Sequence, residues 1–119
     1  MSPSQKVLVI DDDRLLCWAL ERALTGAGYE VSIFHSGEEA KKKLEKCTFD
    51  VVITDLIMAG MDGMDVLEEV RRSCPSTRSV LMTAFGSDDL ARQVEEYDAS
   101  YVSKPFQIEE FVERIHQLF

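Results

Sequence analysis

The chain has 119 residues, 45% of them apolar, which is enough for one packed domain and too few for two. No apolar run approaches the roughly 20 residues that a membrane-spanning helix needs, and the amino end lacks a signal-peptide core, so we expect a soluble, cytoplasmic protein without membrane contact. The formal net charge of -9 repels phosphate backbones and disfavours nucleic-acid binding by this domain alone.

Five short apolar runs alternate with five segments of helical periodicity. The runs occupy residues 7–10, 30–34, 51–54, 80–82 and 100–103. The first and third are almost continuous Val, Ile and Leu, which is typical of strands that are covered on both faces. The second run alternates more, so we place it near an edge of the sheet.

The helical segments between these runs have recognisable boundaries. The first carries an apolar stripe over residues 16–27. Ser36 begins a capping box at the start of the second, and Pro75 lies beyond the end of the third. The fourth follows a plausible cap at Ser87, and the fifth has a core stripe over residues 108–115.

Strict alternation of strands and helices, with short connections, predicts an α/β fold: a doubly wound (βα)5 sandwich around a five-stranded parallel sheet. We expect residues 1–119 to form a single domain. In such folds, ligands bind at the carboxyl ends of the strands, near the point where the strand order reverses. The polar residues directly after each strand are therefore the candidates for function.

Polar side chains follow four of the five predicted strands. In chain order they are Asp11, Asp12, Asp13, Asp55, Thr83 and Lys104. Carboxylates within a few ångströms of one another repel, which shifts their pKa values upward, and a hard divalent cation removes this repulsion. Mg²⁺ suits all-oxygen ligation with retained waters, and Mn²⁺ is an alternative.

These groups together would form an electrostatic cradle for a phosphoryl group. A cation and Lys104 can neutralise its non-bridging oxygens, and Thr83 can donate a hydrogen bond to one of them. One carboxylate must be the nucleophile, because aspartate can form an acyl phosphate. Asp55 is the candidate, since it stands alone at the end of the central strand. Asp11 and Asp12 fit better as metal ligands.

Four segments in order resemble the receiver domain of two-component response regulators, over essentially the whole chain. They are VLVIDDD at 7–13, ITDLIM with GMDG at 53–63, LMTAFG at 81–86 and YVSKPF at 101–106. The resemblance implies a flavodoxin-like fold with strand order 2-1-3-4-5.

The resemblance also implies a role for each acidic residue. Asp55 would be the phosphorylated aspartate. Asp12 would bind Mg²⁺ directly, and Asp11 would act mostly through metal-bound water. The main-chain carbonyl of Ile57 would complete the protein's share of the coordination.

Further roles follow from the same resemblance. Thr83 and Lys104 would contact the phosphoryl group, and a cis peptide bond would join Lys104 to Pro105. Tyr101 would be the switch aromatic that moves inward when Thr83 is drawn toward the phosphate. Ala59 stands where the family usually has proline, which would loosen the loop beside the site without removing a ligand.

Two apolar residues flank the path that a hydrolytic water would take. Ile57 lies two residues beyond Asp55, and Phe85 lies two residues beyond Thr83. Polar groups at these positions tend to speed loss of the phosphoryl group in the family. Because both are apolar here, we predict a long-lived phosphorylated form.

Simpler interpretations compete with these roles. Asp13 is better explained as a helix cap than as a metal ligand. Tyr101 as an ordinary strand aromatic stays an open alternative to the switch role. Asp62 and Gly63 are interpreted as a turn in which Gly63 takes a positive φ.

The three cysteines, Cys17, Cys47 and Cys74, are odd in number and widely spaced. There is no Cys-x-x-Cys motif, so neither a zinc site nor a disulfide framework is indicated. We expect small thiols, buried or half-buried, in a reducing compartment.

The favoured function is a signalling module rather than a separate enzyme. A partner histidine kinase or phosphotransfer protein would phosphorylate Asp55, shifting the surface of the fourth helix, fifth strand and fifth helix. This surface would control an output domain or downstream protein in transcription regulation, with a phosphorylation-dependent homodimer as one form. The chain could be the amino-terminal part of a longer regulator or a receiver that stands alone.

Two other classes remain as alternatives. A Mg²⁺-dependent phosphohydrolase would use the same nucleophile, but the chain has no cap domain and no second carboxylate two residues after Asp55. A pseudo-receiver would bind partners without phosphorylation, although every required side chain is present.

Overall fold

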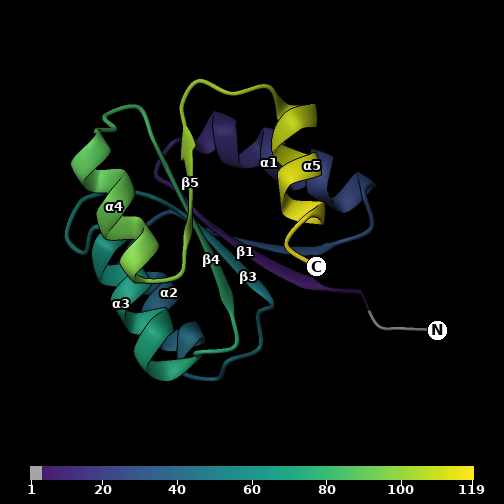
Figure 1. Ribbon diagram of the computed structural model, residues 1–119. Coiled ribbons are helices and arrows are strands. Elements are labelled where there is room, and N and C mark those ends of the chain that lie inside the picture. The colour runs from purple at the N-terminus through teal and green to yellow at the C-terminus, as the bar shows by residue number, and fades with distance from the viewer. Residues whose placement is uncertain (1–3) are drawn as a thin grey trace.

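The computed structural model describes residues 4–119 as one sheet between two layers of helices (Figure 1). The five strands are parallel and lie in the order β2-β1-β3-β4-β5. Their bounds are β1 Lys6–Ile10, β2 Glu30–Phe34, β3 Val51–Asp55, β4 Arg78–Thr83 and β5 Ser100–Ser103. The predicted doubly wound fold and its strand order are confirmed, with the second strand at an edge.

The helices are divided between the two faces of the sheet. In Figure 1, α1 and α5 lie together on one side, and α2, α3 and α4 cover the other. Their bounds are α1 Arg14–Gly26, α2 Gly37–Leu44, α3 Gly63–Ser73, α4 Asp88–Glu96 and α5 Ile108–His116. Within residues 4–119, none of these helices has both the length and the apolar character needed to cross a membrane.

Both faces of the central strands are buried because successive side chains point to opposite sides. On β1, Val7 and Val9 pack in the cluster with α1 and α5. Leu8 and Ile10 pack in the cluster with α2 and α3. All four side chains are fully buried. This two-sided core holds the carboxyl ends of β1 and β3 side by side.

Side-chain oxygens cap α1 to α4, and three of these caps were expected from the sequence. Asp13 Oδ1 accepts the Leu16 amide at 3.1 Å at the start of α1. Ser36 and Ser87 each accept, through Oγ, the amide three residues further on, at 3.2 and 3.1 Å. Capping therefore accounts for Asp13, and this residue does not join the candidate metal ligands.

The prediction of no disulfide is wrong, because Cys47 and Cys74 are bonded, with Cα atoms 5.3 Å apart. Each lies four residues before a strand, Cys47 before β3 and Cys74 before β4. Val51 and Arg78, the first residues of these strands, are paired in register. The register therefore places the two cysteines together, which local sequence spacing cannot reveal. Cys17 is a free, buried thiol, in line with the expectation for it.

Candidate functional site

Three carboxylates meet at the carboxyl edge of the sheet. Ile10 of β1 and Thr54 of β3 are paired in register, so the residues that follow them, Asp11 and Asp55, lie side by side. One carboxylate oxygen from each of Asp11, Asp12 and Asp55 lies within 4.8 Å of the others. Asp11 is fully buried, Asp55 is 9% exposed and Asp12 is exposed. The fold thus brings together the three predicted side-chain metal ligands.

Lys104 reaches this group from the end of β5. Its Nζ lies 2.7 Å from Asp11 Oδ2 and 3.3 Å from Asp55 Oδ1. The backbone amide of Lys104 donates to the Thr83 carbonyl at 2.8 Å, which fixes the strand end. The bond between Lys104 and Pro105 is cis, the geometry that the family resemblance implies. One ammonium group therefore bridges two of the three carboxylates.

Burial raises the pKa of the Asp55 carboxyl above its ordinary value, and the charge of Asp11 raises it further, while Lys104 acts in the opposite direction. For Lys104, burial alone would lower the pKa. The hydrogen bond and charge of Asp11, together with Asp55, outweigh burial and raise it. Lys104 is therefore protonated. Three carboxylates facing one ammonium leave excess negative charge, and all the donor atoms are oxygen, so the group fits a hard divalent cation.

Thr83 ends β4, one residue beyond Met82, which is the register partner of Asp55. Its side chain is buried, and its Oγ1 accepts the Phe85 amide at 3.0 Å. Because this bond uses a lone pair, the hydroxyl proton remains available for another acceptor. A hollow of about 450 Å³ opens next to Thr83, with Tyr101 and Lys104 also on its wall.

Tyr101 lies on the same face of the sheet as Thr83. Its register partner is Leu81, two residues before Thr83, and its half-buried side chain packs against the cluster that contains Leu81. The ring lies tightly against Gly86, where an added Cβ would be only 1.3 Å from the Tyr101 hydroxyl. A packing role for Tyr101 is therefore evident, and a switch role stays a prediction.

The loop after Asp55 passes close to the site. The prediction of a positive φ at Gly63 is wrong, because Gly60 has the positive φ, at 79°, and Asp62 caps α3. Gly63 is required for a different reason. A Cβ at this position would lie 2.3 Å from the Asp55 carbonyl oxygen, so glycine allows α3 to begin directly against the end of β3.

Known proteins share both this fold and this sequence pattern. The profile of the family described as "Response regulator receiver domain" matches residues 7–116. The chain belongs to this family.

Individual relatives agree with this assignment. The DNA-binding transcriptional regulator NtrC of Klebsiella pneumoniae is 40% identical over 105 residues, which are 87% of this chain and 22% of that protein. This receiver thus spans about a fifth of that relative's length. Chemotaxis protein CheY4 of Vibrio cholerae superposes with a TM-score of 0.89 at 28% identity, covering 98% of this chain and 99% of that one. A CheY-like receiver from Methanospirillum hungatei has a TM-score of 0.91 over 97% and 93% of the two chains, and at 24% identity it supports the fold alone.

Two residues to which we assigned no role in the site from the sequence contact the backbone of Asp11 in the receiver. His35 Nδ1 lies 3.0 Å from the Asp11 carbonyl oxygen, and Cys17 Sγ donates to the same oxygen at 3.3 Å. Burial raises the pKa of the Cys17 thiol to about 11, with a further contribution from Asp11 and Asp13. His35 directly follows β2, so its place at a strand end was a usable signal. Cys17 lies near the start of α1, on its buried face, and offered none.

Two exposed apolar residues lie in the loops beside the receiver's site. The side chain of Ile57 is 55% exposed and that of Phe85 is 72% exposed. Both lie in the loops that follow the strands carrying Asp55 and Thr83. The predicted role of the Ile57 main-chain carbonyl in metal binding stays a prediction.

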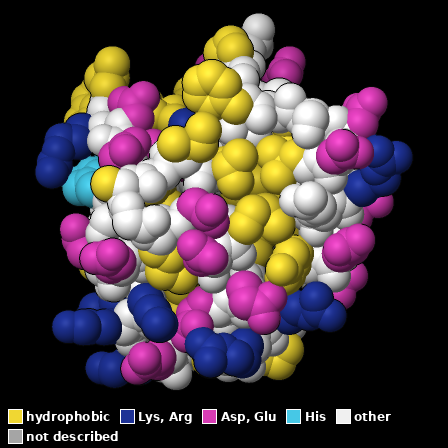
Figure 2. Space-filling model, turned by 90° about the vertical axis from the view of Figure 1, so that its left-hand side faces the viewer, with side chains coloured by type: hydrophobic (Ala, Val, Ile, Leu, Met, Phe, Trp, Pro, Cys, Tyr) yellow, Lys and Arg dark blue, Asp and Glu magenta, His cyan; other side chains and the backbone are white. Residues whose placement is uncertain are grey.

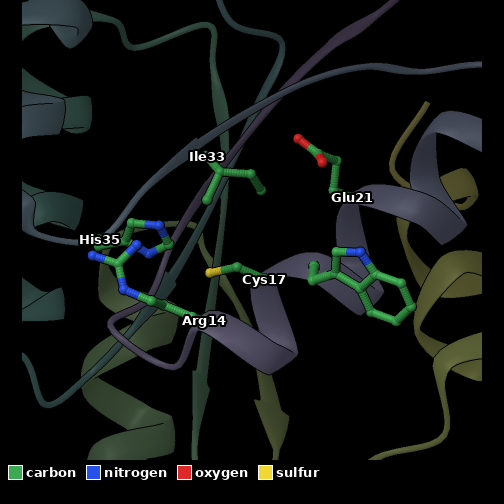
Figure 3. Close-up of a pocket in the computed structure, with 6 residues that line it drawn as sticks. Arg14, Cys17, Glu21, Ile33 and His35 are labelled. Atoms are coloured by element: carbon green, nitrogen blue, oxygen red, sulfur yellow. The ribbon is translucent and has the colours of Figure 1, made fainter.

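A separate hollow of about 300 Å³ lies between α1 and the end of β2. Figure 3 shows Arg14, Cys17 and Glu21 on one wall and Ile33 and His35 on the other. The acidic residues that hold the candidate metal site are not on its wall. This hollow flanks the receiver's site through Cys17 and His35 and does not form it.

Proposed function

We propose that this receiver accepts a phosphoryl group on Asp55 from a partner histidine kinase or phosphotransfer protein, and relays the signal through a conformational change. One observation carries the proposal: oxygens of Asp11, Asp12 and Asp55 lie within 4.8 Å of one another, and Lys104 Nζ contacts two of these carboxylates at 2.7 and 3.3 Å. A nucleophile, a cation site and a fixed ammonium at one edge are the parts that phosphoryl transfer requires.

Mg²⁺ is the proposed cofactor, and Mn²⁺ would fit the same ligands. The side chains of Asp11, Asp12 and Asp55 would hold the ion, with the main-chain carbonyl of Ile57 as a further proposed ligand. When bound, the ion supplies positive charge that stabilises the oxygens of the transferred group. The oxygen-only donor set and its excess negative charge support this choice.

Asp55 acts as the nucleophile. One of its carboxylate oxygens bonds to the phosphorus of the donor phosphohistidine, while the P–N bond breaks and its electron pair leaves with the imidazole, which takes up a proton. Lys104 turns from the Asp55 carboxylate to a non-bridging phosphoryl oxygen. The Thr83 hydroxyl donates its proton to another. The receiver catalyses only this reaction and the later hydrolysis of its own acyl phosphate.

The proposed output is a shift of the surface formed by α4, β5 and α5. Movement of Thr83 toward the phosphoryl group would open space for Tyr101, which lines the same hollow of about 450 Å³. A dianionic group on Asp55, which contacts Lys104 on the wall of this hollow, would thus bias the packing of Tyr101.

Figure 2 looks onto the α3–α4 side and shows hydrophobic side chains gathered among acidic ones. The half-buried residues Met64, Leu90 and Tyr97 belong to this side.

Transcription regulation is the proposed context. The relative NtrC is named as a DNA-binding transcriptional regulator, and a net charge of -9 gives this chain no means to attract DNA. We therefore infer that the receiver acts in the cytoplasm on an output domain or a downstream protein. It would do so as the amino-terminal part of a longer regulator or on its own, and a phosphorylation-dependent homodimer is one proposed form.

Incubation with acetyl phosphate and Mg²⁺, followed by intact-mass measurement, tests the proposal. We expect the addition of one phosphoryl group to the wild type and none to Asp55→Asn. Repeated turnover of a phosphomonoester would instead identify a phosphohydrolase. A folded wild-type protein without any adduct would identify a pseudo-receiver.

A further inference from the structure

We propose that Cys47 and Cys74 form a reversible thiol–disulfide exchange site, in which Cys47 is the sulfur attacked by an external low-molecular-weight thiol. The pair lies at the amino edge of the sheet, opposite the carboxyl edge that carries Asp55. The proposal concerns a covalent modification that the phosphoacceptor role neither uses nor explains.

The two cysteines are brought together by the ends of α2 and α3, and no residue of the phosphorylation site takes part. Cys74 directly follows α3 as its C-cap, and Cys47 lies in the connection from α2 to β3. Their Cα separation of 5.3 Å is within the range that disulfides span without backbone movement. The backbone of Cys47 has a φ of 51°, uncommon for a residue other than glycine or asparagine, and its amide donates to the Leu44 carbonyl at 3.1 Å. The connection is therefore held in a specific conformation at this residue.

The two sulfur-bearing residues differ in access. Cys47 is exposed, whereas Cys74 is 3% exposed. Both line a hollow of about 300 Å³ that also includes Ser73 and Ser76. A small thiol entering this hollow reaches Cys47 from solvent, while Cys74 lies behind it. This asymmetry decides which sulfur is attacked and which one leaves.

The charges near Cys47 favour an anionic attacking group. The last turn of α2 carries Lys41, Lys42 and Lys43, and Lys46 precedes Cys47 directly. Figure 2 shows Lys and Arg side chains, with Asp and Glu side chains among them, along the lower edge of the α3–α4 side. Glu45 and Asp50 are the nearby acidic residues in the sequence, and Asp50 Oδ2 already accepts the Lys6 amide at 2.8 Å. A concentration of lysines in a protein of net charge -9 attracts thiolates to this edge.

The proposed exchange proceeds in two balanced steps. The thiolate of the small thiol attacks the sulfur of Cys47, the protein disulfide breaks, and Cys74 leaves as a thiolate that takes up a proton. A second thiolate then attacks the small-molecule sulfur of this mixed disulfide, which releases Cys47 and the oxidised small disulfide. Two thiols are oxidised and one protein disulfide is reduced. The reverse reaction with the small disulfide closes the pair again.

Reduction would loosen the connection between α2 and β3. Besides the disulfide, this connection is held near β3 by the Thr77 Oγ1 hydrogen bond to the Phe49 carbonyl at 2.8 Å, and by hydrogen bonds of Asp50 with Lys6 and Arg78. Reduction would therefore loosen the part around Cys47 and leave the end at Asp50 in place. The disulfide closes a loop with a sequence separation of 27, so its loss restores chain entropy to the unfolded state. We expect a melting temperature roughly 10 °C lower for the reduced protein.

Alkylation under native and unfolding conditions, read by intact mass, tests the pairing. After equilibration with oxidised glutathione, the protein should weigh less than the reduced form by two hydrogen atoms and accept one alkyl group after unfolding, on Cys17. Cys17 is the internal control, because its burial and its pKa of about 11 make it unreactive in the folded state. Three alkylated cysteines after oxidation, or a disulfide that includes Cys17, would overturn the proposal.

Single-cysteine variants test the order of attack. With Cys74→Ala, oxidised glutathione should form a stable mixed disulfide on Cys47; with Cys47→Ser, the folded protein should form almost none on Cys74. Faster modification of Cys74 than of Cys47 would refute the assigned direction. Reductant should lower the melting temperature of the wild type and leave that of Cys47→Ser unchanged. An equal decrease in melting temperature for both proteins would also contradict the proposal.

Discussion

Asp11, Asp55 and Lys104 come from three different strands, so their chemistry exists only where the strand ends meet. The ammonium of Lys104 lies 2.7 Å from the Asp11 carboxylate and 3.3 Å from that of Asp55, and it partly neutralises both charges. The exposed Asp12 contributes a third carboxylate. Burial raises the pKa of Asp55, and the negative charge of Asp11 raises it further. Three carboxylates share one ammonium at this edge, so the site has room for additional positive charge. This excess of negative charge favours the binding of a cation.

Two exposed apolar residues in the loops beside the site lead to a kinetic prediction. Ile57 and Phe85 are largely exposed and offer no group that would orient a water for attack on the acyl phosphate. We expect the wild-type phosphoform to decay slowly, and Ile57→Asn to shorten its half-life several-fold. The loss of the added mass with time, in the presence of Mg²⁺, measures both rates. Ile57→Leu is the matched apolar control. A wild-type half-life of seconds would contradict the prediction.

At the scale of elements, short sequence patterns predicted the features that depend on neighbouring residues, namely helix caps and strand ends. The capping roles of Asp13 and Ser87, and the strand-end positions of Asp11 and Asp55, follow from short stretches of sequence. Other features depend on register and packing between elements. The close approach of Gly63 to the Asp55 carbonyl, and the pairing of the two cysteines ahead of β3 and β4, could not be derived from spacing alone.

The contact between Gly86 and Tyr101 couples β5 to the loop before α4. A Cβ on Gly86 would lie 1.3 Å from the Tyr101 hydroxyl, so Gly86→Ala must displace the ring. We expect a loss of about 1–3 kcal/mol in unfolding free energy, most of which disappears in a Tyr101→Ala background. Urea unfolding of the four proteins in this double-mutant cycle measures the coupling.

Gly26 provides the matched control, because an added Cβ there meets no atom within 4 Å. Gly26→Ala should be neutral or stabilising in both backgrounds. An equal loss for Gly86→Ala with and without Tyr101 would show that the contact has no energetic role.

A buried carboxylate on α3 predicts a pH dependence of stability. Glu69, whose side chain is 6% exposed, pairs with Arg72 and accepts the Ser73 hydroxyl at 3.1 Å. The hydrogen bond from Arg72 lowers the pKa of Glu69 below its ordinary value of 4.5. The stabilisation is therefore complete above about pH 4.5 and is lost as the pH falls through the lower, folded-state pKa.

Glu69→Gln should reduce the unfolding free energy near neutral pH by about 1 kcal/mol, a modest value because Arg72 is 66% exposed. The difference from the wild type should shrink below about pH 4.5. Urea unfolding over a series of pH values measures it, with the exposed Glu109→Gln as control. A difference that stays constant with pH would argue against the ion pair.

At the scale of the whole molecule, the sheet separates two kinds of chemistry. The carboxyl edge gathers Asp11, Asp12 and Asp55, and the amino edge holds the bonded Cys47 and Cys74. The alternating pattern of strands and helices predicted the fold and therefore the first edge. The disulfide at the amino edge could not be predicted in this way, because it depends on the parallel register of β3 and β4, which brings the connections before these strands together.

Cation binding should stabilise the whole domain, because it relieves repulsion that exists only in the folded state. We expect Mg²⁺ at 100 times its Kd to add about 2.7 kcal/mol to the unfolding free energy of the wild type. Asp12→Asn should lose this increment, yet be at least as stable as the wild type after EDTA treatment, since one repelling charge is gone. Thermal unfolding with and without EDTA measures both effects. An unchanged Mg²⁺ response in Asp12→Asn would exclude this residue as a ligand.

Chemical identification of the phosphorylated residue tests the central claim most directly. Borohydride reduces an aspartyl phosphate to homoserine, so treatment of the phosphorylated protein, followed by peptide sequencing by mass spectrometry, locates the acceptor. We predict homoserine at position 55 and at no other aspartate, with none after omission of the phosphodonor. Homoserine at Asp11 or Asp12, or its absence from a protein that carries the added phosphoryl group, would contradict the assignment of Asp55.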